Sequence, residues 1–158
     1  IKTVSYINSS TLKLLLNRVI ITNVHVTKSP MRITFLGGGS DHENFFKLHG
    51  GLAIYATINK YVFVCTMDQP NFVSDLYKFT YRKTEGVNSI QKIQHPVVRE
   101  ILGEFKWENP INIATMADLP ESSGLGSSSA FTAALYQNLA SRMGLKLNRH
   151  ELSVLLIF

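Results

Sequence analysis

The pattern of hydrophobic and polar positions along the chain predicts a mixture of strands and helices. Stretches rich in β-branched and aromatic residues predict five strands, over residues 20–28, 32–36, 52–67, 77–82 and 111–116. Apolar residues at helical spacing predict helices over residues 11–19, 43–49, 96–105 and 131–143. A bend is expected near Asn59 and Lys60, and a polar loop over residues 84–94. This order is neither a regular βα alternation nor all-β, so the expected fold class is α+β.

Composition narrows the class of protein. The chain has 158 residues, 45% of them hydrophobic and 17% charged, which suits one domain with a substantial core. The single cysteine, Cys65, excludes an internal disulfide and is predicted to be a buried strand residue. No apolar run approaches the roughly 20 residues of a spanning helix, and residues 1–22 do not read as a secretion signal, so a cytoplasmic protein is expected. Because the chain begins with Ile1 and ends in the apolar segment 152–158 without a helix-stop signal, we interpret it as a fragment of a longer protein.

The charge pattern bears on possible ligands. The formal net charge is +5, but the basic residues are scattered and no run of four or more Lys or Arg occurs. A solvated basic surface is therefore expected, without a nucleic-acid partner. A mildly positive surface also suits small anionic ligands such as nucleotides and sugar phosphates.

A glycine- and serine-rich loop carries the most informative chemistry. It reads DLPESSGLGSSSA over residues 118–130, between the last predicted strand and the last predicted helix. Free N–H groups and the macrodipole make a helix N-terminus attractive to phosphate, and Gly124 and Gly126 allow its close approach. Hydroxyl groups that can donate to phosphate or bind Mg²⁺ follow on Ser127, Ser128 and Ser129. The loop matches neither the Walker A nor the dinucleotide fingerprint, and an ordinary helix with a serine N-cap is the alternative.

A second segment, PMRITFLGGGSD over residues 30–41, places three glycines directly after a predicted strand. Glycines there permit positive φ and close approach of a ligand to the backbone. Together the two segments resemble, in the same order, two motifs of the GHMP kinases, the family that includes galactokinase, homoserine kinase and mevalonate kinase. The glycine triplet with Ser40 and Asp41, and MADLP over residues 116–120, are most similar to the D-glycero-D-manno-heptose 7-phosphate kinase branch.

The resemblance implies an ATP- and Mg²⁺-dependent kinase that phosphorylates a hydroxyl of a sugar or sugar phosphate, with no membrane partner. The residues implied to wrap the ATP phosphates are Pro120, Ser123, Gly124, Leu125, Gly126, Ser127, Ser128 and Ser129. Of these, Ser127 and Ser128 are the candidate Mg²⁺ ligands. Arg32 is implied at the phosphoryl-transfer site, where its permanent charge would stabilise the transferring group. The sugar is implied to contact Arg32, Gly38, Gly39 and Asp41.

The resemblance also implies a domain organisation. Residues 21–158 would form a truncated GHMP kinase N-terminal, ATP-binding domain, with residues 1–20 an unmatched extension and the C-terminal domain absent. The implied fold is ribosomal protein S5 domain 2-like: a mixed sheet with helices on one side and a left-handed βαβ unit, an exception to the right-handed rule. The family's catalytic aspartate and magnesium-binding glutamate lie downstream of Phe158, so this fragment alone is not expected to turn over substrate at a normal rate.

Several alternatives stay open. At Gly38 and Gly39 galactokinases have an acid and a histidine, which disfavours galactose and favours a bulkier or phosphorylated sugar. A relative that binds a nucleotide or senses a sugar without transfer is a second hypothesis. An RNA-binding module of the same fold is a third, and it predicts steep salt dependence. At single positions, Arg32 could be a surface arginine, Asp41 could cap the next helix, and His42, His49 and His95 could be surface, turn or loop residues.

Overall fold

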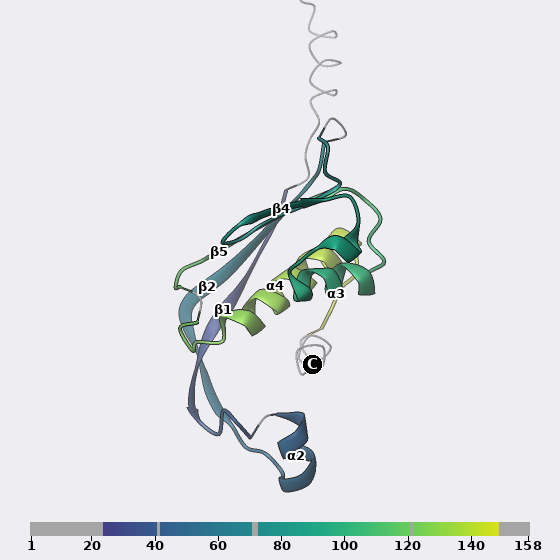
Figure 1. Cartoon of the computed structure of the whole chain (residues 1–158). Coiled ribbons are helices and arrows are strands. Elements are labelled where there is room, and N and C mark those ends of the chain that lie inside the picture. The colour runs from purple at the N-terminus through teal and green to yellow at the C-terminus, as the bar shows by residue number, and fades with distance from the viewer. Residues whose placement is uncertain (1–23, 41, 71–72, 121, 149–158) are drawn as a thin grey trace, which may run out of the picture.

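The computed structural model of the chain describes residues 24–40, 42–70, 73–120 and 122–148 (Figure 1). The helix predicted over residues 11–19, the side chain of Asp41 and the apolar segment 152–158 lie outside the described residues.

The described part of the chain is an α+β fold, as predicted. Its strands are β1 (His25–Leu36), β2 (Ile54–Asp68), β3 (Tyr77–Thr80), β4 (Thr84–Val87) and β5 (Ile111–Ala117). Its helices are α2 (Glu43–His49), the short 3₁₀ helix η1 (Ile90–Lys92), α3 (Pro96–Glu104) and α4 (Ser127–Arg142). The positions predicted for α2, α3, α4, β2, β3 and β5 are confirmed to within a few residues.

The strands form one mixed sheet in the order β1-β2-β5-β3-β4. The pairs β1–β2, β2–β5 and β3–β4 are antiparallel, and β3 pairs with β5 in parallel. Helices α3 and α4 lie side by side on one face of this sheet (Figure 1). The parallel pair β3–β5 requires a crossover, which runs through β4, η1 and α3.

Two predictions about strands are wrong. The described part of the extended piece predicted over residues 20–28 and the piece predicted over residues 32–36 belong to one strand, β1, which runs through Pro30. Proline is tolerated there because β1 is an edge strand and needs no donor on its outer side. The polar loop predicted over residues 84–94 contains β4 and η1. Its polar composition misled the prediction because β4 is also an edge strand, although its Glu85 is buried.

The core lies between the sheet and the two helices. Fully buried side chains come from the sheet at Met31, Val64 and Ile111 and from the helices at Leu102 and Leu135. The predicted apolar stripe of α4 is confirmed at its first three positions, but the fourth residue, Met143, is 50% exposed because it follows the last turn of the helix. Cys65 is only half-buried, because it alternates with the buried Val64 along β2.

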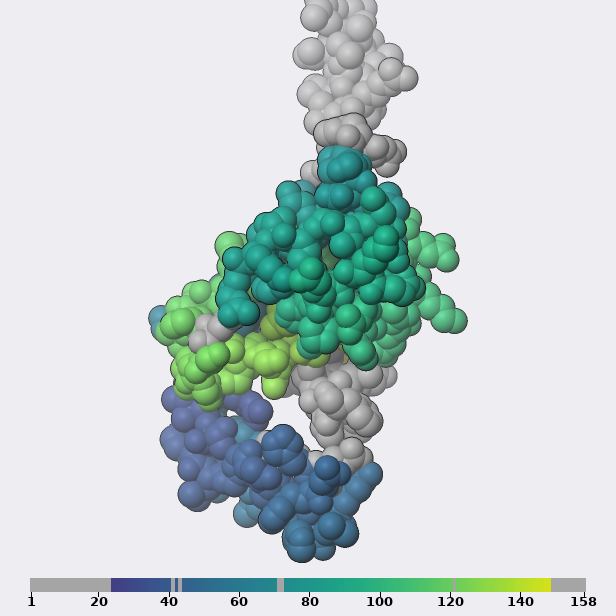
Figure 2. All heavy atoms as spheres, in the orientation of Figure 1, coloured from purple at the N-terminus to yellow at the C-terminus, as the bar shows by residue number. Residues whose placement is uncertain are grey.

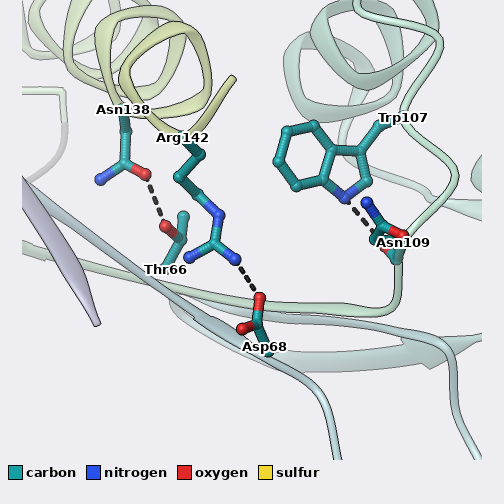
Figure 3. Close-up of polar contacts among 6 residues, drawn as sticks. All are labelled: Thr66, Asp68, Trp107, Asn109, Asn138 and Arg142. Carbon is teal, nitrogen blue, oxygen red and sulfur yellow. Dashed lines mark hydrogen bonds and ion pairs between the residues drawn. The ribbon is translucent and has the colours of Figure 1, made fainter. Parts of the chain in front are cut away.

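Polar contacts fix the C-terminal half of α4 on β2 (Figure 3). The fully buried Asn138 accepts a hydrogen bond from the Thr66 hydroxyl and donates to the carbonyls of Val64 and His25, at 3.2 and 3.1 Å. One turn further on, Arg142 forms an ion pair with Asp68. These contacts set the position of α4, and therefore of the loop that precedes it.

Beyond the point where β5 stops pairing at Val62, β1 and β2 continue as a two-stranded ribbon that carries α2 at its end (Figure 1). Figure 2 shows this end of the molecule, in blue, standing apart from the teal and green body. Apolar side chains are exposed on it at Phe35, Leu36, Leu48 and Leu52. Within the described residues, no helix has the length and apolar character needed to cross a bilayer.

Candidate functional site

The two glycine-containing segments meet at Arg32. The backbone N–H of Arg32 donates a hydrogen bond to the carbonyl of Leu125, at 2.9 Å. The Arg32 side chain lies so close to Gly126 that a Cβ there would come within 2.9 Å of Arg32 Cγ and 3.0 Å of Nε. The strand and the loop are thus packed together.

An irregularity in the strand pairing occurs where Arg32 meets the loop. The register of β1 against β2 shifts between Pro30 and Arg32, whose partners are Tyr61 and Thr57. Such irregularities re-aim side chains and often lie next to functional sites. The bend predicted near Asn59 and Lys60 coincides with this shift.

The loop before α4 has the backbone of an anion site. Ser122, Gly124 and Gly126 have φ of 62°, 73° and 70°, so the chain repeatedly enters the left-handed region. Gly126 is the N-cap of α4, and no side chain caps that end of the helix. The alternative of an ordinary serine N-cap is therefore wrong. Successive N–H groups in left-handed turns and at a helix N-terminus form concavities that bind anions.

The predicted serines differ in their surroundings. Ser127 opens α4 and is half-buried, Ser128 is exposed and Ser129 is half-buried. Pro120 and Ser123 are exposed, whereas Leu125 packs against the core. Only Ser127 and Ser128 of this group line the adjoining cavity.

An open cavity of about 550 Å³ lies beside the start of α4. Its remaining lining comes from the loop, the sheet, the turn between β3 and β4, helix α4 and the segment that leads into α3: Val62, Phe79, Tyr81, Arg82, Lys83, Gln94, His95, Pro96, Thr115, Ala117, Ser122 and Phe131. Ligand pockets typically measure about 300–1,000 Å³, so this one is large enough for a nucleotide-sized ligand. It combines serine hydroxyls near a helix N-terminus with aromatic rings and two cationic side chains.

The aromatic wall of the cavity is a contiguous cluster. The rings of Phe79 and Tyr81 stack at 4.7 Å between centroids. His95 meets Phe79, Tyr81 and Phe131 edge-on, at 5.2, 5.3 and 5.4 Å. His95 is therefore more than the loop residue that we expected: it is the N-cap of α3 and part of the cavity wall. His42 and His49, by contrast, are exposed, as predicted.

Buried Glu85 links Tyr81 to the segment that leads into α3. Its carboxylate accepts the Tyr81 hydroxyl and the Gln94 N–H, both at 2.7 Å. Burial would raise the pKa of Glu85, but these two hydrogen bonds and the positive charges of Lys83 and His95 outweigh it, so that pKa lies below its usual range. The hydrogen bond to Glu85 in turn raises the pKa of Tyr81. The carboxylate is thus held ionised, and it fixes the Tyr81 ring.

The glycine triplet has a structural role in the β1–β2 ribbon. Gly37 has φ of 77°, and a Cβ on it would collide with the carbonyl oxygen of Leu52, 1.8 Å away. Ser40 closes the same turn, because its hydroxyl donates to the carbonyls of Gly37 and Leu52 at 2.9 and 2.8 Å. Gly38 and Gly39 are exposed and lack positive φ. The positive φ expected of the triplet is therefore needed only at Gly37.

Sequence reasoning missed one neighbour of Arg32. The Arg32 guanidinium lies over the ring of Tyr55, with its carbon 4.2 Å from the ring centroid. Tyr55 lies on β2 opposite Thr34, diagonal to Arg32 across the ribbon. Only the strand register brings the two residues together, so the sequence carried no local signal for this pair.

The fold and the site together define an α+β domain that has a left-handed glycine loop at a helix N-terminus, beside an open cavity of nucleotide size. Comparison with known proteins shows which family the chain resembles. Residues 88–157 match the family model "GHMP kinases N terminal domain". The resemblance to GHMP kinases that the motifs indicated is confirmed, including its similarity to the heptose phosphate kinases.

Individual relatives agree with this family. The chain is 25% identical over 140 residues to the D-glycero-alpha-D-manno-heptose 7-phosphate kinase of Campylobacter jejuni, covering 82% of this chain and 41% of that protein. A solved D-glycero-D-manno-heptose 1-phosphate kinase from Bacteroides thetaiotaomicron matches with a TM-score of 0.69 at 25% identity, over 84% of this chain and 46% of that one. Lactococcus lactis galactokinase, at 20% identity and a TM-score of 0.62 over 94% of this chain and 40% of its own, shares the fold. The chain therefore spans less than half the length of these relatives.

Proposed function

We propose that this chain is the ATP-binding part of a kinase that transfers the γ-phosphoryl group of ATP to a hydroxyl of a sugar or sugar phosphate. The observation that carries the proposal is the junction of Arg32 with Gly126 beside a cavity lined by Ser127 and Ser128. At this junction a permanent positive charge lies next to the N-terminus of α4, whose first two serines line a cavity of nucleotide size.

ATP would lie with its base against the aromatic wall and its phosphates at the loop. Tyr81 and His95 offer ring surfaces to a purine, and the hydrogen bond to Glu85 holds the Tyr81 ring in place. The N–H groups from Gly124 to Ser129 would bind the phosphate oxygens. Arg82 and Lys83, at the rim, would add positive charge.

Mg²⁺ fits this site as a companion of the ATP phosphates. Among the described residues, no group of three or more His, Cys, Asp or Glu side chains could hold a metal ion. Magnesium bound with a nucleotide usually keeps several waters and takes only one or two protein ligands besides phosphate oxygens. The hydroxyls of Ser127 and Ser128 could supply such ligands, and the ion would neutralise charge on the transferring group.

The acceptor would be a heptose 7-phosphate or a related sugar phosphate. Arg32 would stabilise the charge that develops during transfer. Gly38, Gly39 and Asp41 would face the sugar. Because the chain spans less than half of its relatives, ATP binding and sugar phosphorylation are separate steps of the proposal, and each has its own test. We also propose a cytoplasmic location.

The first test is calorimetric titration of the 158-residue chain with ATP in Mg²⁺. Ser127→Ala should weaken binding, because it removes a hydroxyl from the phosphate end of the cavity. Ser141→Ala is the matched control, because this exposed serine lies at the opposite end of α4. If the wild-type chain showed no ATP binding, or if both variants behaved alike, the assignment of the nucleotide site would be wrong.

The second test is phosphoryl transfer from radiolabelled ATP to a panel containing galactose, mannose and heptose 7-phosphate. The expected product is a phosphorylated heptose phosphate, formed by this chain more slowly than by its longer relatives. ATP binding with no transfer to any sugar, even with the complete gene product, would favour a nucleotide-binding or sensing relative that does not transfer phosphate.

A further inference from the structure

Tyr55 is tied to the Arg32 site by three structural facts. The Arg32 guanidinium lies over its ring at 4.2 Å. Arg32 is itself packed against Gly126, the N-cap of α4, and joined to Leu125 through its backbone. The two residues are diagonal neighbours across the β1–β2 ribbon, a separation that aromatic and long side chains can span.

The ring restricts where the positive charge of Arg32 can lie. An arginine side chain has many rotamers, and ordering it costs conformational entropy. A guanidinium that stacks on a ring is already ordered before a ligand arrives. In this chain the ring lies on the ribbon side of Arg32 and Gly126 lies on the loop side, so the guanidinium is held between β2 and the start of α4.

We propose that Tyr55 is a positioning residue, whose ring holds the Arg32 guanidinium beside Gly126 so that it meets the terminal phosphate of the bound nucleotide. This inference rests on the proposed function. Ser127 and Ser128 line the same cavity as the aromatic wall, and Gly126, which packs against Arg32, directly precedes them in the loop. With the base against the aromatic wall and the phosphates at the loop, as proposed above, the phosphate that reaches Arg32 would be the one furthest from the base, which ATP has and ADP lacks.

The test compares ATP and ADP affinities of the 158-residue chain, measured by calorimetry in Mg²⁺. Tyr55→Leu should weaken ATP binding about two- to fivefold, the range of an exposed cation–π contact, and leave ADP binding unchanged. Tyr55→Phe keeps the ring and should keep wild-type affinity for both nucleotides. Tyr61→Leu is the matched control, because this tyrosine lies on the same strand under the ammonium group of Lys28, at 4.7 Å.

A second readout needs no nucleotide, and its first measurement needs only the wild-type chain. In the free chain, the Tyr55 ring current should shift the Arg32 Hδ and Hε NMR signals upfield. Tyr55→Phe should keep this shift and Tyr55→Leu should abolish it. Random-coil positions of these signals in the wild-type chain would overturn the proposal even if Tyr55→Leu failed to fold.

The remaining outcomes separate the two proposals. Two results would overturn the role of Tyr55 and leave the proposed function standing. One is an unchanged ratio of ATP to ADP affinity in Tyr55→Leu, which includes equal losses for both nucleotides. The other is a Tyr55→Phe variant that binds ATP as weakly as Tyr55→Leu does. A wild-type chain that binds neither nucleotide would overturn the proposed function, and the role of Tyr55 with it.

Discussion

Replacing Gly126 with alanine should destabilise the chain more than the same change at Gly124. Both glycines have left-handed backbones, with φ of 70° and 73°. They differ in their surroundings, because a Cβ on Gly126 would meet Arg32 whereas a Cβ on Gly124 would have no heavy atom within 4 Å. The pair therefore separates the cost of the backbone conformation from the cost of the contact with Arg32.

The structure allows both costs to be estimated. A left-handed conformation costs a residue with a Cβ about 1–2 kcal/mol, and this is the whole expected loss for Gly124→Ala. At Gly126 the new methyl group would lie 2.9 Å from Arg32 Cγ and 3.0 Å from Nε. Because Cγ is close to the backbone, Arg32 cannot move away by rotating its end alone. Overpacking of this kind adds about 1–3 kcal/mol, so Gly126→Ala should cost about 2–5 kcal/mol in total.

The assay is urea unfolding, followed by far-ultraviolet circular dichroism and analysed for the free energy of unfolding at constant m-value. Gly144→Ala is a second control, with φ of 73°, open space around its Cβ and a place at the other end of α4. The double variant Arg32→Ala, Gly126→Ala tests the cause. Without the Arg32 side chain, the cost of Gly126→Ala should fall to that of Gly124→Ala.

Two results would refute this reasoning. Equal costs at Gly126 and Gly124 in the wild-type background would mean that Arg32 does not pack against the loop. An excess cost at Gly126 that persisted after Arg32→Ala would mean that some other contact causes it.

Three further predictions concern parts of the fold that support the site. Asn138→Leu should lower the free energy of unfolding by about 2–3 kcal/mol, because it leaves buried partners unsatisfied, and a urea midpoint close to wild type would contradict this. Asp68→Asn should lower the free energy of unfolding by less than about 1 kcal/mol, because the Asp68 side chain is 48% exposed, and Arg142→Ala should lower it more, because the Arg142 side chain is only 9% exposed. Equal losses of the two variants in urea titrations would argue against this ranking. The pKa of Glu85 is lowered from 4.5, so its charge should stabilise the fold above that pH, and the cost of Glu85→Gln should shrink as pH falls below about 4.5; a cost that does not change with pH would be the contrary result.

The sequence predicts those helices and strands that bury one face, because their apolar residues recur at a regular spacing. The alternation around Tyr77 and Phe79 and the four-residue spacing of Phe131 and Leu135 correspond to side chains that are buried in the structure. Both patterns are local, so they can be read without knowing the neighbours. The loop before α4 was also found from sequence, because glycines and serines before a helix have a local physical meaning. The edge strand β4 was missed because a short, polar edge strand lacks such a pattern.

The walls of the site could not be predicted in the same way. Tyr55 lies under Arg32 because of the register of two strands, and His95 joins the Tyr81 ring because Glu85 ties β4 to the start of α3. These contacts link residues from different elements, and no spacing along the chain encodes them. Glu85 is the residue that links these elements, but in the sequence it looks like any solvated surface charge. Only its burial, which the structure shows, distinguishes it.

Contacts at the two ends of α4 hold the loop that precedes it. At the C-terminal end, Asn138 and Arg142 fix the helix on β2. At the N-terminal end, the Leu125 carbonyl is held by the Arg32 backbone, and the Arg32 side chain fills the space beside Gly126. Under the proposed function, a loop fixed in this way would not have to be ordered when the phosphate binds, so more of the interaction energy would appear as affinity. The same argument makes the buried Asn138 relevant to function, because a helix that shifted on β2 would carry the loop away from Arg32.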